Sequence, residues 1–353
     1  MYQPQLISDP DKITSEWLTE VLNANNMNGT VDSFTAESIG TGQVGENVRF
    51  TLTGSGDIPQ TVVGKFPSPD PVSRATGIQL QNYEREVHFY KHYQQRVEIQ
   101  TPNVLFTEID NDTHDFIILM EDLAPGVQGD QLAGCDGSDA ELALVQLAQL
   151  QGPLWGDNSI IDGHIIKDAS NEPDVTSDLY NSLMPGFLDR YQNRLNDQEI
   201  EMVKLVGESM PRYRDAPKIE RTMIHIDYRL DNMMFGGPYP LAVVDWQSYT
   251  YGCGLNDASY FMGTSMRPDE RAQHDEVLLK KYYDTLQGYD VDLSWEDCWY
   301  YYRFFAPAGL IMAVIASMIV GETDRGNDMF MVMAKGSARM SRELDAIGAI
   351  QGQ

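Results

Sequence analysis

The sequence predicts an α+β fold with two lobes, the first small and rich in strands and the second larger and helical. The chain has 353 residues, which is more than one ordinary hydrophobic core accommodates. Strand-like alternation of apolar and polar residues prevails in residues 1–123, whereas helical spacing prevails in residues 124–353. These two ranges are the predicted lobes.

Four short strands and one principal helix are expected in the first lobe. Residues 48–52 alternate and end at a Gly-Ser-Gly turn, and residues 61–66 form an apolar strand that ends before three prolines. Residues 83–90 have helical spacing. Two further strands are expected at 104–109 and 116–120, on either side of a polar turn.

The second lobe is expected to be mainly helical, starting with a helix at 140–154. Its spacing predicts an inward apolar face of Leu142, Leu144, Val145, Leu147 and Leu150. Further helices are expected at 178–194, 197–210, 268–287, 294–320 and 326–348.

The charge balance excludes several classes of partner. Asp and Glu number 53 against 25 Lys and Arg, so the formal net charge is −28. Such a chain is repelled by phosphate backbones and anionic lipids, so neither nucleic acid nor a membrane is an expected partner. We interpret the acidity mainly as a heavily hydrated surface, with a substrate-steering field as the alternative.

The cysteines and the apolar segments favour a soluble, cytoplasmic protein. Cys135, Cys253 and Cys298 are too few and too scattered for a disulfide framework, and none belongs to a Cys-x-x-Cys zinc motif. Residues 1–17 lack the apolar core of a signal peptide. The longest apolar run, 304–320, contains a proline and is short for a membrane span, so a buried helix is expected.

The stretch from residue 223 to residue 235 is the most informative in the chain. His225, Asp227 and Asn232 have the spacing H-x-D-x-x-x-x-N, and an apolar strand that follows ends at Asp245. Phosphoryl transfer needs a carboxylate that accepts or orients the proton of the attacking hydroxyl, a role that Asp227 fits. It also needs oxygen ligands that hold Mg²⁺ against the phosphates, a role that Asn232 and Asp245 fit. The alternative is a turn whose polar side chains merely satisfy its backbone.

Residues of the first lobe support the same interpretation independently. Lys65 lies inside an apolar strand, where a lysine is awkward without a partner, and Glu86 in the next helix is a suitable partner. Such a pair holds the α- and β-phosphates of ATP in kinases. Gly40, Gly42 and Gly45 form a glycine-spaced turn before a strand, which alone would also suit an ordinary hairpin. Because the turn is followed along the chain by Lys65, Glu86, the H-x-D-x-x-x-x-N motif and Asp245, we assign Gly40 and Gly42 to the nucleotide site.

Together these motifs resemble the aminoglycoside phosphotransferase-like branch of the protein-kinase-like fold. Within it, residues 33–347 are most similar to ecdysteroid kinase-like and choline kinase-like small-molecule kinases. The resemblance rests on His-Ile-Asp-Tyr-Arg-Leu-Asp-Asn at 225–232 and Val-Val-Asp-Trp-Gln at 243–247, and residues 254–261 resemble the start of a family helix. It implies a two-lobe kinase fold that transfers the γ-phosphoryl group of ATP to a hydroxyl of a small acceptor.

The resemblance also implies roles for residues around the main motif. Asp227 would be the catalytic base, and Asn232 and Asp245 would be Mg²⁺ ligands. His225 would be a structural member of the loop. Asp257 would act from behind the catalytic residues or cap a helix.

The nucleotide-binding residues follow from the same resemblance. Lys65 would contact the phosphates of ATP, and Glu86 would orient Lys65. The backbone at Glu121 and Leu123, after an apolar strand, would face the adenine.

Some positions depart from the family pattern or leave a choice. Position 226 is Ile where the family usually has Gly, and Ile resists conformations that Gly reaches, so an altered loop path would affect rate rather than reaction type. Glu84 and Glu86 lie about 200° apart on a helix, so only one can face Lys65, and we favour Glu86. No Ala-Pro-Glu signature follows Asp245, so no protein substrate is expected.

The sequence leaves the acceptor open. An aromatic segment at 295–305 either packs as helix core or lines an apolar pocket for a sterol- or lipid-like alcohol. Aromatic faces could instead hold a quaternary ammonium group, and clustered carboxylates would suit an aminoglycoside. Arg229 either meets an anionic part of the substrate or braces an acidic neighbour.

A nucleotide-binding pseudokinase that serves as an interaction module is the alternative function, because a fold does not fix a function. Ile226 is its support in the sequence. A metal-dependent hydrolase is disfavoured, because the six histidines form no His-rich ligand set.

Overall fold

The computed structural model describes residues 4–40, 44–166, 174–214 and 219–352. The chain divides into two compact units. The first unit contains Met1–Arg96, Gln100–Gly126 and Gly236–Tyr249; the second contains Val97–Ile99, Val127–Phe235 and Thr250–Gln353. The segment that carries Asp245 thus groups with the first unit, although it follows residue 123 in the sequence.

A five-stranded antiparallel sheet in the order β1-β2-β3-β5-β4 forms the first unit. Its strands are β1 (Gly29–Ile39), β2 (Gly45–Gly56), β3 (Thr61–Pro67), β4 (Val104–Ile109) and β5 (Phe116–Glu121). The four predicted strands are confirmed. The sequence did not predict β1, because most of its residues are exposed and they give no strong apolar alternation.

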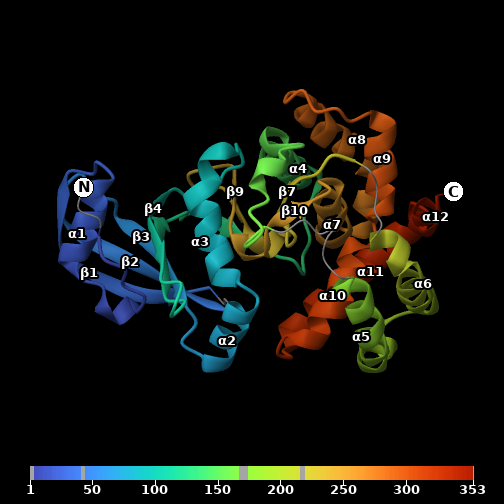
Figure 1. Cartoon of the computed structure of the whole chain (residues 1–353), viewed down its shortest axis with the longest axis horizontal. Helices are drawn as coiled ribbons and strands as arrows, with labels where there is room; N and C mark the ends of the chain where they lie inside the picture. Colours follow the sequence, from blue (N-terminus) through green and yellow to red (C-terminus); the bar gives the residue numbers. More distant parts are fainter. Residues whose placement is uncertain (1–3, 41–43, 167–173, 215–218, 353) are drawn as a thin grey trace. The chain divides into compact units, whose positions relative to one another are not determined.

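In the described part of the first unit three α-helices accompany the sheet, so the expectation of one principal helix was wrong. They are α1 (Ser15–Ala24), α2 (Pro71–Gln79) and α3 (Asn82–His92), of which only α3 was predicted. Helix α1 lies beside β1 (Figure 1) and buries Trp17 and Val21 against the sheet. Pro71 opens α2 at its first turn, where a missing N–H costs nothing.

The second unit is mainly helical. Its helices are α4 (Gly137–Gln151), α5 (Val175–Tyr191), α6 (Asp197–Arg214), α7 (Leu255–Ser265), α8 (Pro268–Gln287), α9 (Trp295–Phe304), α10 (Ala308–Ile319), α11 (Asp324–Glu343) and α12 (Ala346–Gln351). Helix α10 packs against both α5 and α11, as Figure 1 shows. Two predicted long helices are each divided, 294–320 into α9 and α10, and 326–348 into α11 and α12.

Helix α4 corrects one predicted core residue. Leu144, Leu147 and Leu150 are fully buried, but Leu142 is 38% exposed. Leu142 lies two residues from Leu144, which is about 200° around the helix, so the two cannot share a face.

The apolar segment Trp295–Ile319 has the length and composition of a membrane span, but it is part of the core of the second unit. It consists of α9 and α10, and 67% of its most apolar window is buried. Leu310 and Val314 of α10 are fully buried. The buried helix predicted within 304–320 is confirmed as α10.

Glycines allow the central helices of the second unit to approach closely. A Cβ on Gly336 of α11 would lie 2.3 Å from the carbonyl oxygen of Gly263 of α7. A Cβ on Gly309 of α10 would lie 2.3 Å from a methyl carbon of Thr264. These helix crossings therefore require the absence of a side chain.

Short strands frame the candidate catalytic loop, residues 225–232. β7 (Thr222–Ile224) leads into the loop and pairs with β10 (Thr250–Gly252). β8 (Met233–Phe235) leaves the loop and pairs with β6 (Val127–Gln128). In the first unit, β9 (Leu241–Val243) leads to Asp245.

Candidate functional site

Lys65 lies between two carboxylates of the first unit. It is on β3, and its Nζ lies 2.6 Å from Glu86 Oε2 and 2.9 Å from Asp245 Oδ1. Burial alone would lower the pKa of Lys65, but the charges of Asp245 and Glu86 outweigh burial and raise that pKa. Lys65 is therefore a stable ammonium ion held in a largely buried site.

The structure pairs Lys65 with Glu86 and not with Glu84. The side chain of Glu86 is 3% exposed, whereas Glu84 lies 3.1 Å from Nδ1 of His114. Burial raises the pKa of Glu86 to about 6, which still leaves the carboxylate ionised at neutral pH. The predicted contact is therefore present as an ion pair.

The turn after β9 fixes Asp245 in place. Asp245 has a left-handed backbone (φ 68°), a conformation that Asp tolerates better than most residues. The next residue, Trp246, stacks on Phe89 of α3 with ring centroids 3.7 Å apart. Gln247 Nε2 donates to Asp245 Oδ2 at 3.1 Å. These contacts hold Asp245 beside the helix that carries Glu86.

One glycine of the glycine-rich turn, Gly45, lies next to Lys65. Gly40 directly follows β1 and has the left-handed conformation (φ 74°), and Gly42 lies outside the described residues. A Cβ on Gly45 would lie 3.1 Å from the Phe66 carbonyl oxygen and 3.4 Å from Lys65 Cε. Glycine at position 45 therefore lets the start of β2 run close to the lysine.

Glu121 and Leu123 lie at and just after the end of β5. The Glu121 N–H donates to the Asn103 carbonyl at 2.9 Å, and its carboxylate accepts from the Tyr239 hydroxyl at 2.8 Å. The Leu123 carbonyl accepts from the Gly126 N–H at 2.8 Å. These bonds order the backbone, and contact with adenine stays a prediction.

Three side chains of the second unit hold Asp227. Its Oδ1 accepts hydrogen bonds from Arg229 Nε and from the Tyr260 hydroxyl, each at 2.8 Å, and its Oδ2 accepts from Asn232 Nδ2 at 2.9 Å. Burial alone would raise the pKa of Asp227, but Arg229 and the hydrogen bonds from Tyr260 and Asn232 lower it. Asp227 is therefore ionised and has a fixed orientation.

Arg229 braces acidic neighbours, which was one of its two predicted roles. Besides Asp227, it contacts Asp231, whose Oδ2 lies 2.6 Å from Arg229 Nη1. Arg325, at the start of α11, binds both carboxylate oxygens of Asp231, at 3.0 and 3.2 Å. Tyr260 and Arg325 are missing from the sequence-based site because their contacts form only in the folded unit.

Ile226 adopts a strained backbone conformation. Its φ is 72°, and no other β-branched residue in the described part of the chain has a positive φ. Its N–H donates to Asp257 Oδ1 at 3.0 Å, and the His225 N–H donates to Asp257 Oδ2 at 2.5 Å. Burial raises the pKa of Asp257 to about 7, against the effect of these two donors. Asp257 thus holds the backbone of the catalytic loop by hydrogen bonds and supports the catalytic residues indirectly.

Three of the seven aromatic residues at 295–305 serve packing. Tyr302, Phe304 and Phe305 are buried. Trp295 and Trp299 form a partly exposed row whose ring centroids are 6.1 Å apart. For the three buried rings, the structure supports the packing interpretation.

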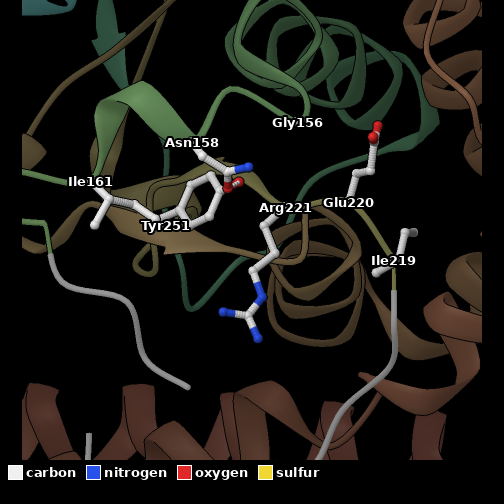
Figure 2. A pocket seen from close by; sticks show the side chains of 7 residues that line it. All are labelled: Gly156, Asn158, Ile161, Ile219, Glu220, Arg221 and Tyr251. Carbon is white, nitrogen blue, oxygen red and sulfur yellow. Dashed lines mark hydrogen bonds between the residues drawn. The ribbon is translucent and has the colours of Figure 1, made fainter. Parts of the chain in front are cut away.

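A polar pocket of about 290 Å³ opens at the start of β7, at the end of the strand away from Asp227. Figure 2 shows Asn158 and Tyr251 close together, where the Tyr251 hydroxyl donates to Asn158 at 2.7 Å. The side chains of Glu220 and Arg221, which directly precede β7, extend in different directions. The pocket contains none of the predicted site residues.

Solved structures of small-molecule kinases share this fold. A protein from Ralstonia eutropha provisionally assigned as an aminoglycoside phosphotransferase matches with a TM-score of 0.55 and 15% identity, over 93% of this chain and 98% of that one. The choline kinase LicA from Streptococcus pneumoniae matches with a TM-score of 0.50 and 15% identity, over 92% and 98%. The gentamicin complex of APH(2″)-IIa matches with a TM-score of 0.51 and 16% identity, over 94% and 99%. The predicted α+β, protein-kinase-like fold is confirmed.

A family model identifies the relationship more directly. No curated protein matches the sequence. The model of the ecdysteroid kinase-like family matches residues 47–293, a range that contains Lys65, Glu86, Asp227, Asn232 and Asp245. The chain therefore belongs to the ecdysteroid kinase-like family of small-molecule kinases.

Proposed function

We propose that this chain is an Mg·ATP-dependent phosphotransferase whose acceptor is an alcohol group of a small molecule. In the proposed reaction, the acceptor oxygen bonds to the γ-phosphorus while the bond from that phosphorus to ADP breaks, and Asp227 orients or takes the hydroxyl proton. Lys65 binds phosphate oxygens, with Glu86 fixing its position. Gly40 and Gly42 belong to the nucleotide-binding turn.

The observation that carries the proposal is the position of Lys65 between Glu86 and Asp245. Two carboxylates around one ammonium leave a net charge of −1 in a largely buried place. Isolated buried charge is costly, so a structural role alone would favour a neutral pair. The surplus negative charge instead suits a site that receives a metal ion together with phosphates.

Asp227 has the geometry of a residue that orients a hydroxyl group. Two donors occupy Oδ1, and Asn232 is the donor on Oδ2. Because these donors stabilise the ionised form, Asp227 is a weak base. In a loose phosphoryl-transfer transition state, positioning the attacking oxygen matters more than base strength.

Asn232 and Asp245 each carry an oxygen of the kind that Mg²⁺ prefers. Asn232 directs its amide nitrogen to Asp227, so its amide oxygen is the atom left for a cation, and Asp245 provides carboxylate oxygens. Across the described residues, no group of three His, Cys, Asp or Glu side chains is arranged for a metal. Such a sparse ligand set is usual for Mg²⁺, which keeps water and phosphate oxygens as its other ligands. When bound, Mg²⁺ would neutralise phosphate charge.

The acceptor class and the remaining assignments belong to the same proposal. A sterol- or lipid-like alcohol, an amino alcohol and a sugar are the candidate acceptors. The backbone at Glu121 and Leu123 would face adenine. We place the lobe boundary near residue 123 and expect the protein to act in the cytoplasm, without a nucleic acid, membrane or protein substrate.

A phosphoryl-transfer screen read by mass spectrometry tests the proposal. The protein and Mg·ATP are mixed with pooled aminoglycosides, choline analogues, sugars, and sterol or lipid alcohols. Asp227→Ala is expected to lower turnover by about 100-fold or more while nucleotide still binds. Asp292→Ala, which removes an exposed carboxylate outside the site, is the matched control and is expected to keep wild-type turnover.

Two results would contradict the proposal. Most of the activity surviving in Asp227→Ala would remove Asp227 from its role. Nucleotide binding without a product from any pool would favour the pseudokinase alternative.

A further inference from the structure

A segment just after the predicted lobe boundary braces the catalytic loop. Gln128 Nε2 donates to the Asp231 carbonyl at 2.5 Å, and the Gly129 N–H donates to the Met233 carbonyl at 2.9 Å. A Cβ on Gly129 would lie 2.6 Å from the Leu230 carbonyl oxygen, so the two backbones touch. Residues 127–131 therefore run alongside residues 230–233, at the C-terminal end of the loop, within hydrogen-bonding distance.

Gln131 is the most deeply placed residue of this segment. It is fully buried, and its Oε1 accepts from the Leu230 N–H at 3.0 Å while its Nε2 donates to the Thr264 carbonyl at 2.6 Å. Its backbone N–H donates to Asp231 Oδ1 at 3.3 Å. One side chain thus joins the loop to the end of α7.

The amide group at this position is chemically specific. The site requires an acceptor for the Leu230 N–H and a donor for the Thr264 carbonyl at the same time, which an amide provides. An ionised Glu would lack the donor and would place a second negative charge near Asp231. Met would fill the space but leave two buried polar groups unpaired.

We propose that Gln131 is a positioning residue that sets Asn232 for Mg²⁺ binding, an inference that rests on the proposed function. Leu230 and Asp231, the residues that Gln131 holds, directly precede Asn232. The Asn232 side chain is anchored at its nitrogen by Asp227, so a shift of this backbone redirects the amide oxygen. A purely stabilising role would change the folding of the unit without changing its demand for Mg²⁺.

The test compares Gln131→Met with Gln151→Met in the full chain. Gln151 is also fully buried, and its amide accepts from the Tyr282 hydroxyl at 2.5 Å and donates to the Gly254 carbonyl at 3.1 Å. Both variants therefore lose one buried donor and one buried acceptor, but only Gln131 bonds to the catalytic loop. This makes Gln151→Met a matched control for stability.

Binding of the non-hydrolysable nucleotide AMP-PNP is measured by calorimetry, without Mg²⁺ and at rising Mg²⁺ concentrations. Gln131→Met is expected to need about tenfold more Mg²⁺ for half-maximal enhancement of binding, as is usual when a residue behind a metal ligand is lost. Its affinity without Mg²⁺ is expected to equal that of the wild type. Gln151→Met is expected to keep the wild-type Mg²⁺ requirement despite a similar fall in Tm.

The outcomes separate this inference from the proposed function. If the wild type shows no Mg²⁺-dependent nucleotide binding, the proposed function fails and the inference falls with it. If the wild type shows Mg²⁺-dependent nucleotide binding and Gln131→Met has an unchanged Mg²⁺ requirement, only the inference is overturned.

Should Gln131→Met not fold, Gln128→Ala replaces it, because Gln128 is exposed and bonds to the Asp231 carbonyl. If Gln128→Ala needs about threefold more Mg²⁺ than the wild type for half-maximal enhancement of AMP-PNP binding, the inference is supported. If its Mg²⁺ requirement is unchanged, the inference is overturned.

Discussion

Ile226 shows how a single residue can carry a conformational cost next to a candidate catalytic group. A left-handed backbone costs an L-residue roughly 1–2 kcal/mol, and a β-branched side chain is especially rare there. Asp257 holds this conformation by accepting the N–H groups of both Ile226 and His225. The loop therefore keeps a shape that glycine would adopt without strain.

The strain predicts an inverted order of stability at position 226. Ala is normally more stable than Gly by about 0.5–1 kcal/mol in regular structure. Here Ile226→Gly is expected to be more stable than Ile226→Ala by about 1 kcal/mol, because only glycine relieves the positive φ. Urea unfolding of the two variants measures the difference. Equal stability, or the usual order, would show that Ile226 is not strained.

Contacts between distant residues limited what the sequence could predict about the site. The Lys65–Glu86 contact could be predicted because helix geometry allows only one of two glutamates to face the lysine, and the apolar Val87, Phe89 and Tyr90 favour Glu86 at the edge of the buried face. Tyr260 and Gln131 could not be predicted in this way. Tyr260 reaches Asp227 across 33 residues and Gln131 reaches Leu230 across 99, and no local pattern marks either residue.

At the scale of elements, periodicity was reliable where one face of a segment is buried. The strands β3, β4 and β5 and the helix α3 were predicted because their apolar residues repeat at the expected spacing. The sequence does not predict helix α2, because Pro71, which opens the helix, belongs to the group of prolines that marks the end of the preceding strand. The sequence predicts a single helix at 294–320, because aromatic residues in α9 lead into the aliphatic residues of α10, although residues 305–307 separate the two helices.

The glycine contact between α7 and α11 predicts a severe effect from one methyl group. Gly336→Ala would place a Cβ 2.3 Å from a backbone carbonyl, which cannot move aside as a flexible side chain can. We expect a loss of about 1–3 kcal/mol in unfolding free energy, measured by urea unfolding.

Gly186→Ala in α5 is the matched control for this helix crossing. A Cβ there would lie at an ordinary 3.4 Å from Met318 Sδ, so the change is expected to be neutral or to stabilise by up to about 1 kcal/mol. Similar losses from both substitutions would mean that close helix approach is not what Gly336 provides.

For the molecule as a whole, the net charge of −28 predicts a dependence on salt. Excess like charge destabilises a compact state through self-repulsion, and salt shortens the range of that repulsion from about 10 Å at 0.1 M to about 3 Å at 1 M. Raising NaCl is therefore expected to raise Tm by several degrees in a thermal melt. A flat or falling Tm would mean that attractive pairs such as Arg271–Asp275 outweigh the repulsion.

The division into a strand-rich and a helical part was predictable at this scale, but the membership of one segment was not. Residues 236–249 follow the catalytic loop in sequence, yet their contacts place them in the first unit. Apolar spacing marks β9 as buried without indicating which core buries it. Only the fold shows that Asp245 and Lys65 share a unit.

The bonds of Gln131 also bear on the order in which the protein is made. Its partners Leu230 and Thr264 lie 99 and 133 residues further along the chain. At about 5–20 residues per second, a ribosome takes on the order of ten seconds to add such a length. During that interval the amide of Gln131 has neither native partner. A nascent chain must therefore extend beyond residue 264 before the catalytic loop can be held from both sides.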